Sequence, residues 1–210
     1  MKFWACFLLI TAAFCSNNTK CLPNYVFERN FATRLTNNNK QMANICSTRY
    51  VFVGKKENIS RLAADIKMVS QNSMRNECER YWCLYLATDL LGEDAQTTKM
   101  YVRGDFYVEE VRRKKLLLNT STAGVPCYEL FKRIAEKYEL EHYWMAEETG
   151  CIGIWSNDAD RAVWDWEYAV CIDGCTENYF SSYALARKFA EKQKMEEPSA
   201  EVEIYNIEYE

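Results

Sequence analysis

The sequence predicts an α+β fold, with a mainly antiparallel sheet, helices packed on one face of it, and disulfides that stabilise it. Three observations point to this class. First, 49% of the 210 residues are apolar and only seven are glycine, which suits a packed core and excludes low-complexity chains. Second, segments of two-residue and of helical periodicity alternate along the chain. Third, an even number of cysteines follows an apolar leader, as in disulfide-linked extracellular domains.

The first 15 residues form a predicted secretory signal peptide. Lys2 precedes an apolar run from Phe3 to Cys15, and polar residues begin at Ser16. Cleavage after Cys15 places small residues at the two positions that signal peptidase recognises. The run is shorter than the roughly 20 residues that a membrane-spanning helix needs, which argues against an uncleaved anchor. We therefore expect a secreted, extracellular protein with no membrane span after cleavage.

The remaining chain is predicted to have two parts. Residues 16–48 are rich in asparagine and are expected to form an irregular arm tethered by disulfides, and residues 49–210 a single α+β domain. Within that domain, residues 128–137 and 183–192 are identical at five of ten positions. This similarity indicates either a duplicated strand–helix–strand unit, with halves of about 49–140 and 141–210 and both helices on one sheet, or only the common composition of amphipathic helices.

Local patterns predict the elements in chain order. Strands are expected over 49–54, 99–103, 106–108, 116–118, 142–147, 151–155, 163–172 and 202–204. Helices are expected from an Asn58 cap to Val69, over 77–91 up to Gly92, over 127–138, and from a Ser181 or Ser182 cap to Met195 before Pro198.

An alternating aromatic stripe marks residues 163–172. The residues expected on one face are Trp164, Trp166, Tyr168, Val170 and Ile172. Such a stripe forms either the inner face of a sheet or a platform on which sugars stack. Its continuation into Val170 and Ile172 favours the core, because these aliphatic side chains are unfavourable in water.

Eight cysteines remain after the predicted cleavage, and all are disulfide candidates: Cys21, Cys46, Cys78, Cys83, Cys127, Cys151, Cys171 and Cys175. Eight cysteines allow 105 pairings, so the sequence does not give the connectivity. Zinc is the rival interpretation, but only Cys171 and Cys175 have a zinc-like spacing and no second pair accompanies them. Three sequons, at Asn17, Asn58 and Asn119, are candidate glycosylation sites in a secreted protein.

Catalytic chemistry has little support. The single histidine, His142, has no nucleophile motif near it, and no glycine-rich phosphate loop is present. Acid pairs that a glycosidase could use are Glu147 with Glu148, Asp158 with Asp160, and Asp165 with Glu167. The segment from Asn157 to Asp160 resembles the start of a calcium loop but lacks the glycine and the closing glutamate. We therefore assign no catalytic residue, no metal ligand and no cofactor.

The tripeptide Arg103-Gly104-Asp105 lies between two strand-like segments. Gly-Asp at this position predicts a two-residue hairpin turn. In a secreted protein an exposed turn of this sequence is a possible integrin-binding motif, and a plain turn is the alternative.

The sequence thus favours a secreted, non-enzymatic binding or interaction protein, with an unknown protein or small molecule as ligand. A pI of about 5.3 argues against nucleic acid as a partner. Two alternatives remain: an extracellular hydrolase that uses paired carboxylates, and a small-molecule carrier whose aromatic sheet face lines a pocket.

Overall fold

The computed structural model describes residues 45–72, 75, 81–148 and 153–210. These all belong to one compact unit, residues 42–210. The predicted signal peptide and most of the predicted arm lie outside the described residues. The predicted end of the arm at residue 48 is wrong, because a strand already begins at Ile45.

The described elements are of both types, with strands in the majority. In chain order they are β1 (Ile45–Val53), α2 (Lys56–Ser70), α3 (Cys83–Tyr85), the π-helical η2 (Leu86–Leu90), β2 (Gly104–Val111), β3 (Lys115–Ala123), α4 (Tyr128–Lys137), β4 (Glu141–Glu148), β5 (Gly153–Ser156), β6 (Tyr168–Ile172), β7 (Cys175–Phe180), α5 (Tyr183–Glu196), β8 (Val202–Asn206) and β9 (Glu208–Tyr209).

Two sheets, both dominated by antiparallel pairs, organise these elements. The larger has six strands in the order β2-β3-β1-β4-β5-β9, and the smaller has the order β7-β6-β8. β1 lies inside the larger sheet, with Tyr50 opposite Leu118 on one side and Trp144 on the other. The only parallel pair among the described strands joins β5 to β9. Mixed α and β content with two antiparallel-rich sheets confirms the coarse prediction of fold class.

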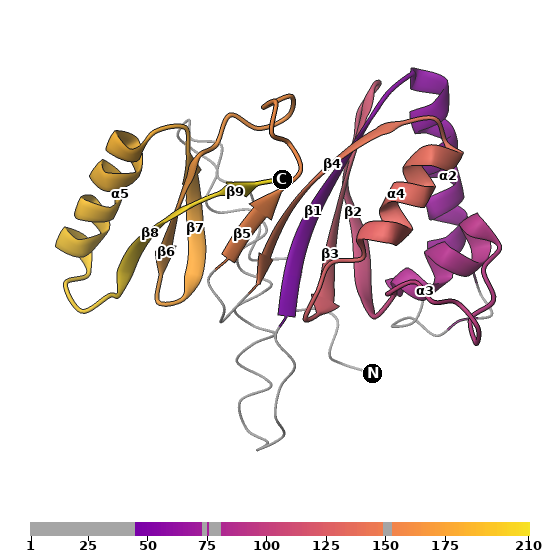
Figure 1. Cartoon of the computed structure of the whole chain (residues 1–210), viewed down its shortest axis with the longest axis horizontal. Helices are drawn as coiled ribbons and strands as arrows, with labels where there is room; N and C mark the ends of the chain where they lie inside the picture. The colour runs from indigo at the N-terminus through magenta and orange to yellow at the C-terminus, as the bar shows by residue number, and fades with distance from the viewer. Residues whose placement is uncertain (1–44, 73–74, 76–80, 149–152) are drawn as a thin grey trace, which may run out of the picture. The chain divides into compact units, whose positions relative to one another are not determined.

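Alternation along β1 separates two apolar layers. Tyr50 and Phe52 point toward α2, η2 and α4, where they join the main core. Val51, on the opposite face, packs in a second cluster with Trp164 and Ala169 of the segment that leads into and forms β6. A third cluster lies between the smaller sheet and α5. Helices therefore cover one face of the larger sheet, and the smaller sheet lies against its other face (Figure 1).

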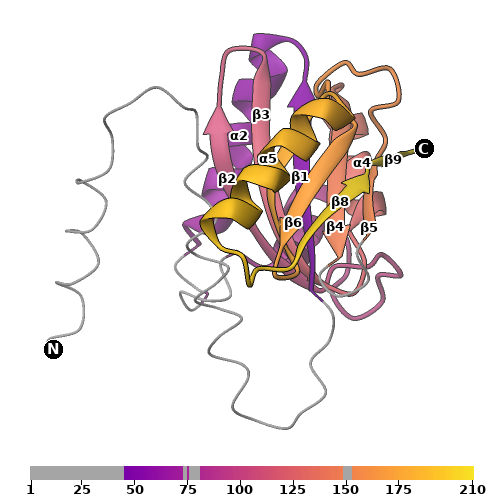
Figure 2. The same cartoon turned by 90° about the vertical axis from the view of Figure 1, so that its left-hand side faces the viewer.

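The smaller sheet begins with a tight hairpin between β6 and β7. Asp173 and Gly174 form its turn, with φ of 51° and 76°, and Ile172 pairs with Cys175 across it. Asp-Gly with two positive φ values is the preferred two-residue hairpin turn. The zinc-like spacing of Cys171 and Cys175 is a consequence of this hairpin. α5 lies along the smaller sheet on the side away from the larger one (Figure 2).

The predicted hairpin turn at Gly104-Asp105 is wrong. Gly104 is the first residue of β2 and pairs with Thr122, while residues 99–103 form no strand. The hairpin turn lies instead after Val111, where the Arg112 N–H donates to the Lys115 carbonyl at 2.7 Å. A Cβ at Gly104 would lie 2.4 Å from the Ser121 carbonyl oxygen. The glycine thus permits close approach of two strands.

The predicted single strand over 163–172 is also only partly right. β6 begins at Tyr168, and residues 163–167 are irregular. Trp164 is 6% exposed, which confirms its place in a core. However, Trp164 and Trp166 belong to the cluster between the sheets, whereas Val170 and Ile172 face α5. The five residues therefore do not share one face, because the irregular segment changes the side-chain parity.

The helices occur near the predicted positions, but their caps and packing partners differ in part from the prediction. α4 matches its prediction, and the Ser182 side chain caps α5 by accepting from the Leu185 N–H. α2 begins at Lys56, so the predicted Asn58 cap is wrong. The described helix before Gly92 begins at Cys83. α4 packs on the larger sheet and α5 on the smaller, so the prediction that both lie on one sheet is wrong.

Candidate functional site

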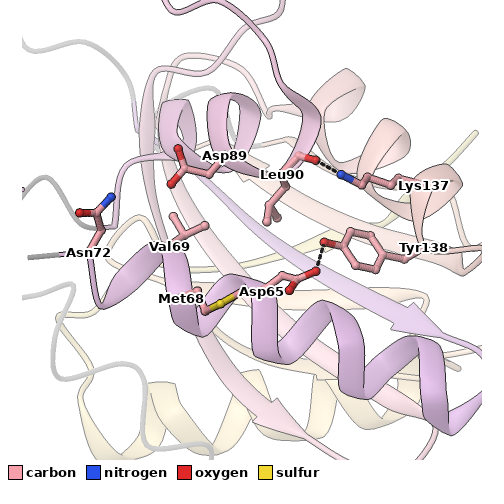
Figure 3. Close-up of a pocket in the computed structure, with 8 residues that line it drawn as sticks. All are labelled: Asp65, Met68, Val69, Asn72, Asp89, Leu90, Lys137 and Tyr138. Atoms are coloured by element: carbon pink, nitrogen blue, oxygen red, sulfur yellow. Dashed lines mark hydrogen bonds between the residues drawn. The ribbon is translucent and has the colours of Figure 1, made fainter. Parts of the chain in front are cut away.

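A pocket of about 430 Å³ lies on the helical face of the larger sheet, between α2, η2 and the end of α4. Its lining residues among those described are Asp65, Met68, Val69, Asn72, Asp89, Leu90, Lys137 and Tyr138 (Figure 3). The four from α2 and its end are spaced by three or four residues, so they form one helical face. The volume falls in the range of roughly 300–1,000 Å³ typical of ligand pockets.

Two interactions connect the end of α4 to the other walls. The Tyr138 hydroxyl donates to Asp65 Oδ2 at 2.6 Å, and Lys137 Nζ donates to the Leu90 carbonyl (Figure 3). Burial, followed by the bond to Asp65, raises the pKa of Tyr138 above its ordinary value of 10.0. Tyr138 therefore remains a neutral donor near neutral pH, and the pocket is held by contacts between residues far apart in sequence.

Asp89 links the pocket to an exposed aromatic surface. Its Oδ1 accepts from Arg75 Nη2 at 2.8 Å and from Thr88 Oγ1 at 2.9 Å. The Arg75 guanidinium lies 3.5 Å from the centroid of the Tyr85 ring, and Tyr85 stacks with Trp82 at 6.3 Å with an interplanar angle of 9°.

We call Tyr81, Trp82 and Tyr85 the aromatic ledge. Tyr81 is 47% exposed and Trp82 41% exposed. Tyrosine, tryptophan and arginine are the residues that contribute most to binding at protein interfaces. The aromatic ledge therefore places exposed tyrosine and tryptophan side chains beside the pocket.

The two carboxylates that line the pocket each use one oxygen in hydrogen bonds within the protein. Among the described residues, Asp65 accepts a hydrogen bond through Oδ2 and Asp89 accepts through Oδ1. The other two oxygens, Oδ1 of Asp65 and Oδ2 of Asp89, have no hydrogen-bond donor among the residues that the structure describes. The exposed Met68 and the buried Val69 and Leu90 add apolar surface. The arrangement suits a group with an apolar stem and a cationic end.

The acid pairs considered in the sequence lie elsewhere, and none lines this pocket. Glu147 accepts from Thr176 Oγ1 at 2.6 Å and from the Tyr179 hydroxyl at 3.4 Å, so it joins the two sheets. Glu148 ends β4. Asp165 and Glu167 are exposed residues of the irregular segment before β6. These acids therefore have structural or surface positions outside this pocket.

Asp158 organises the loop after β5. Its carboxylate is buried and accepts the backbone N–H groups of Ala162, Val163 and Trp164 at 2.7 to 2.8 Å, whereas Asp160 is exposed. Asn157 bonds to the backbone of Trp144 and His142. The segment that resembled a calcium loop thus uses its polar side chains to hold the chain itself. No group of three or more potential metal ligands occurs in the described part of the chain.

His142 lies on β4 beside the ring of Phe52, with ring centroids 6.5 Å apart. Burial, followed by the charge of Lys132, lowers the pKa of His142 below 6.5. It is only partly exposed and lies outside the pocket.

The other predicted site residues are scattered over the described structure. Arg103 and Asp105 are exposed at the start of β2, so the integrin-type motif lacks the turn on which that interpretation depended. Asn58 lies in the first turn of α2, and the Asn119 side chain on β3 donates to Glu109 at 2.8 Å. The Asn17 sequon lies outside the described residues.

Five of the eight candidate cysteines are described. Cys46, Cys83, Cys127 and Cys171 are buried thiols, and Cys175 follows the hairpin turn. Cys21, Cys78 and Cys151 lie outside the described residues. No helix in the described ranges has both the length and the apolarity to cross a bilayer.

The sequence did not single out the pocket residues. Asp65 adjoins the apolar face of α2, and Lys137 and Tyr138 end α4, but such positions are common in amphipathic helices. Their meeting depends on three separate segments of the chain, residues 65–72, 89–90 and 137–138. The adjacent aromatic residues Tyr81 and Trp82 could have indicated a binding surface, but the sequence alone does not show that their side chains are exposed. A scan of protein-family models finds no match, and neither a curated protein nor a solved structure is significantly similar to the chain.

Proposed function

We propose that the protein is a secreted binding protein that recognises a lysine- or arginine-bearing segment of a protein partner. Secretion is supported by the N-terminal signal-peptide pattern. The observation that carries the binding proposal is the pocket with two carboxylates, Asp65 and Asp89, on opposite walls. The basic side chain of the partner enters between them, and the flanking main chain contacts the aromatic ledge.

Hydrogen-bond acceptors, rather than net charge, favour a basic side chain over a neutral one. Lys137 Nζ donates to the Leu90 carbonyl and Arg75 Nη2 donates to Asp89 Oδ1, so these two cations offset much of the negative charge of Asp65 and Asp89. A cation between the second oxygens of Asp65 and Asp89 would gain charge-assisted hydrogen bonds. Its methylene stem would cover Met68, which is 65% exposed. The partner is a protein because an aromatic ledge beside the pocket extends the contact beyond one side chain.

The test is a titration of the isotopically labelled protein followed by NMR. The probes are the N-acetyl methylamides of lysine and arginine, with the norleucine derivative as the neutral control. We expect saturable amide shifts around Asp65 and Asp89 with the two cationic probes and none with norleucine. Asp65→Asn keeps an acceptor for Tyr138 but removes charge, and it should weaken binding about tenfold, or about 1.4 kcal/mol. Asp160→Asn, on an exposed loop, is the matched control and should bind normally.

Two results would count against the proposal. Equal shifts with norleucine, or unchanged affinity in Asp65→Asn, would show that the carboxylates do not select a cation. A small molecule retained in the pocket, seen by native mass spectrometry of the secreted protein, would replace a protein partner by a carrier function.

A further inference from the structure

One end of the larger sheet carries a concentration of positive charge. The hairpin between β2 and β3 has the sequence Arg112-Arg113-Lys114-Lys115, and the chain that links β1 to α2 reads Gly54-Lys55-Lys56. β1 and β3 are neighbours in the sheet, and the Gly54 N–H donates to the Lys114 carbonyl at 3.1 Å. Both connections therefore lie at the same end of the sheet (Figure 1). We call their six lysine and arginine residues the basic tip.

Most charges of the basic tip have no partner within the described structure. Five of the six side chains belong to exposed residues, and Lys115 is half-buried. Among the described residues, Arg112 forms an ion pair with Glu110 at 2.6 Å, and no ion pair engages the other five. The basic tip thus displays cationic groups that a ligand can reach.

The acids at this end of the sheet do not cancel that charge. Besides Glu110 they are Glu57, in the first turn of α2, and Glu139 and Glu141, before and at the start of β4. β4 lies on the other side of β1 from β3, so Glu139 and Glu141 are placed away from the hairpin. A local excess of positive charge therefore occurs in a chain whose formal net charge is −4.

The hairpin turn does not require this composition. Tight turns favour asparagine, aspartate and glycine, and neither Arg113 nor Lys114 has a positive φ. Adjacent cations repel one another, which opposes folding. The repulsion acts on Lys115, whose pKa is lowered from its ordinary value of 10.5 by burial and then by the charge of Arg112. Since the charges do not serve the turn, they indicate a role in binding an anion.

We propose that the basic tip binds a sulfated polysaccharide outside the cell. The sulfate groups accept charge-assisted hydrogen bonds from the exposed ammonium and guanidinium groups of both connections, and counterions released from the polyanion favour binding. Runs of lysine and arginine of this length are typical of surfaces that bind heparin or nucleic acid. The choice of an extracellular polyanion rests on the secretion that the proposed function includes, but none of the six residues lines the pocket.

Two other polyanions fit the basic tip less well. Single-stranded nucleic acid is held by aromatic side chains on which the bases stack, and residues 53–56 and 111–115 contain no aromatic residue. Membranes attract basic segments through the anionic lipids of the cytoplasmic leaflet, which a secreted protein does not meet. A linear sulfated chain needs only a cluster of accessible cations, which is what the two connections provide.

Binding to heparin tests the proposal. The full chain, secreted from eukaryotic cells, is applied to immobilised heparin at about 0.15 M salt and eluted with a salt gradient. Calorimetry with soluble heparin at several salt concentrations then measures the affinity. We expect retention, and an affinity that falls steeply as salt rises. Fully desulfated heparin is the ligand control and should not bind.

Variants of equal charge change locate the site. Arg113→Gln/Lys114→Gln should weaken heparin binding about tenfold and make its salt dependence shallower. Lys55→Gln/Lys56→Gln should weaken it in the same way from the other connection. The matched control, Lys188→Gln/Lys194→Gln, removes the same charge from exposed positions of α5 and should bind like the wild type. Urea unfolding midpoints like that of the wild type would show that the variants are folded.

Several results would overturn the proposal. They are a wild type that is not retained, equal binding to desulfated heparin, and an equal loss of affinity in the α5 control. Tighter binding to phosphatidylserine vesicles or to an oligothymidylate would replace the polysaccharide by a membrane or a nucleic acid. A chain that stays inside the cells would remove an extracellular polysaccharide as the ligand.

The basic tip and the pocket can be tested separately. Asp65→Asn should bind heparin like the wild type, and Arg113→Gln/Lys114→Gln should keep the amide shifts that the lysine probe causes around the pocket. Loss of heparin binding with intact binding of the lysine probe would overturn this inference alone, and the reverse would overturn only the function proposed for the pocket.

Discussion

At the scale of single residues, His142 is a sensitive reporter because it is the only histidine of the chain. It is packed beside Phe52, and Lys132 and Glu136 are the charged groups that act on it. Burial and Lys132 lower its folded pKa, while Glu136 opposes them. The neutral imidazole is therefore the form that the folded protein prefers.

We expect part of the stability to be lost as the pH falls below 6.5. At that point the unfolded chain takes up a proton on His142, whereas the folded protein does so only at its lower pKa, so protonation favours unfolding. Urea unfolding at about pH 7.5 and about pH 5.5 measures the loss. His142→Gln, which cannot titrate, should lose less over the same interval. An identical loss in the variant would assign the pH dependence to carboxylates.

Asp158 and Asp160 show how neighbouring acids can differ. Asp158 accepts three backbone N–H groups, whereas Asp160 is exposed. Asp158→Ala should cost at least about 2 kcal/mol of unfolding free energy, because buried donors lose a charged acceptor. Asp160→Ala should cost under about 0.5 kcal/mol. Chemical denaturation of both variants measures the difference, and similar losses would show that the carboxylate of Asp158 does not hold the loop.

At the scale of elements, α4 and α5 share sequence but not packing. The aligned residues Leu130 and Leu185 are 0% and 52% exposed. α4 buries four apolar side chains against the larger sheet, whereas Ala186 is the fully buried residue of α5. The residues that the two segments share therefore form a helix in both α4 and α5, but only in α4 do they pack extensively into a core.

This difference is measurable with one substitution in each helix. Leu130→Ala should cost about 2–5 kcal/mol, because it leaves a cavity in the main core. Leu185→Ala should cost under about 0.5 kcal/mol, because the side chain is exposed. Equal losses in urea unfolding experiments would contradict the packing described for α5.

For the molecule as a whole, the predicted signal peptide of residues 1–15 is the feature to test. Expression of the full chain in eukaryotic cells should yield protein in the medium whose first residue is Ser16. N-terminal sequencing measures this. Leu9→Lys interrupts the apolar run and should retain the protein in the cells. Secretion with an intact Met1, or normal secretion of the variant, would show that residues 1–15 are not a cleaved signal.

Local sequence patterns account for the mixed α and β content and for the position of most described elements. α4 and the paired strands β4 and β5 follow from local patterns, because helical and strand periodicities are set by each segment's own apolar spacing. The Ser182 cap is equally local, since the side chain bonds to a backbone group three residues away.

How those elements combine depends on packing between segments that are distant in the chain. Gly104 serves a close strand approach rather than a turn, because the Ser121 carbonyl occupies the space of a side chain. The stripe at Trp164 divides between two cores, because β6 begins after it. The hydrogen bond between Asp65 and Tyr138 joins segments 73 residues apart. Such contacts depend on the packing of the whole unit, which no local pattern encodes.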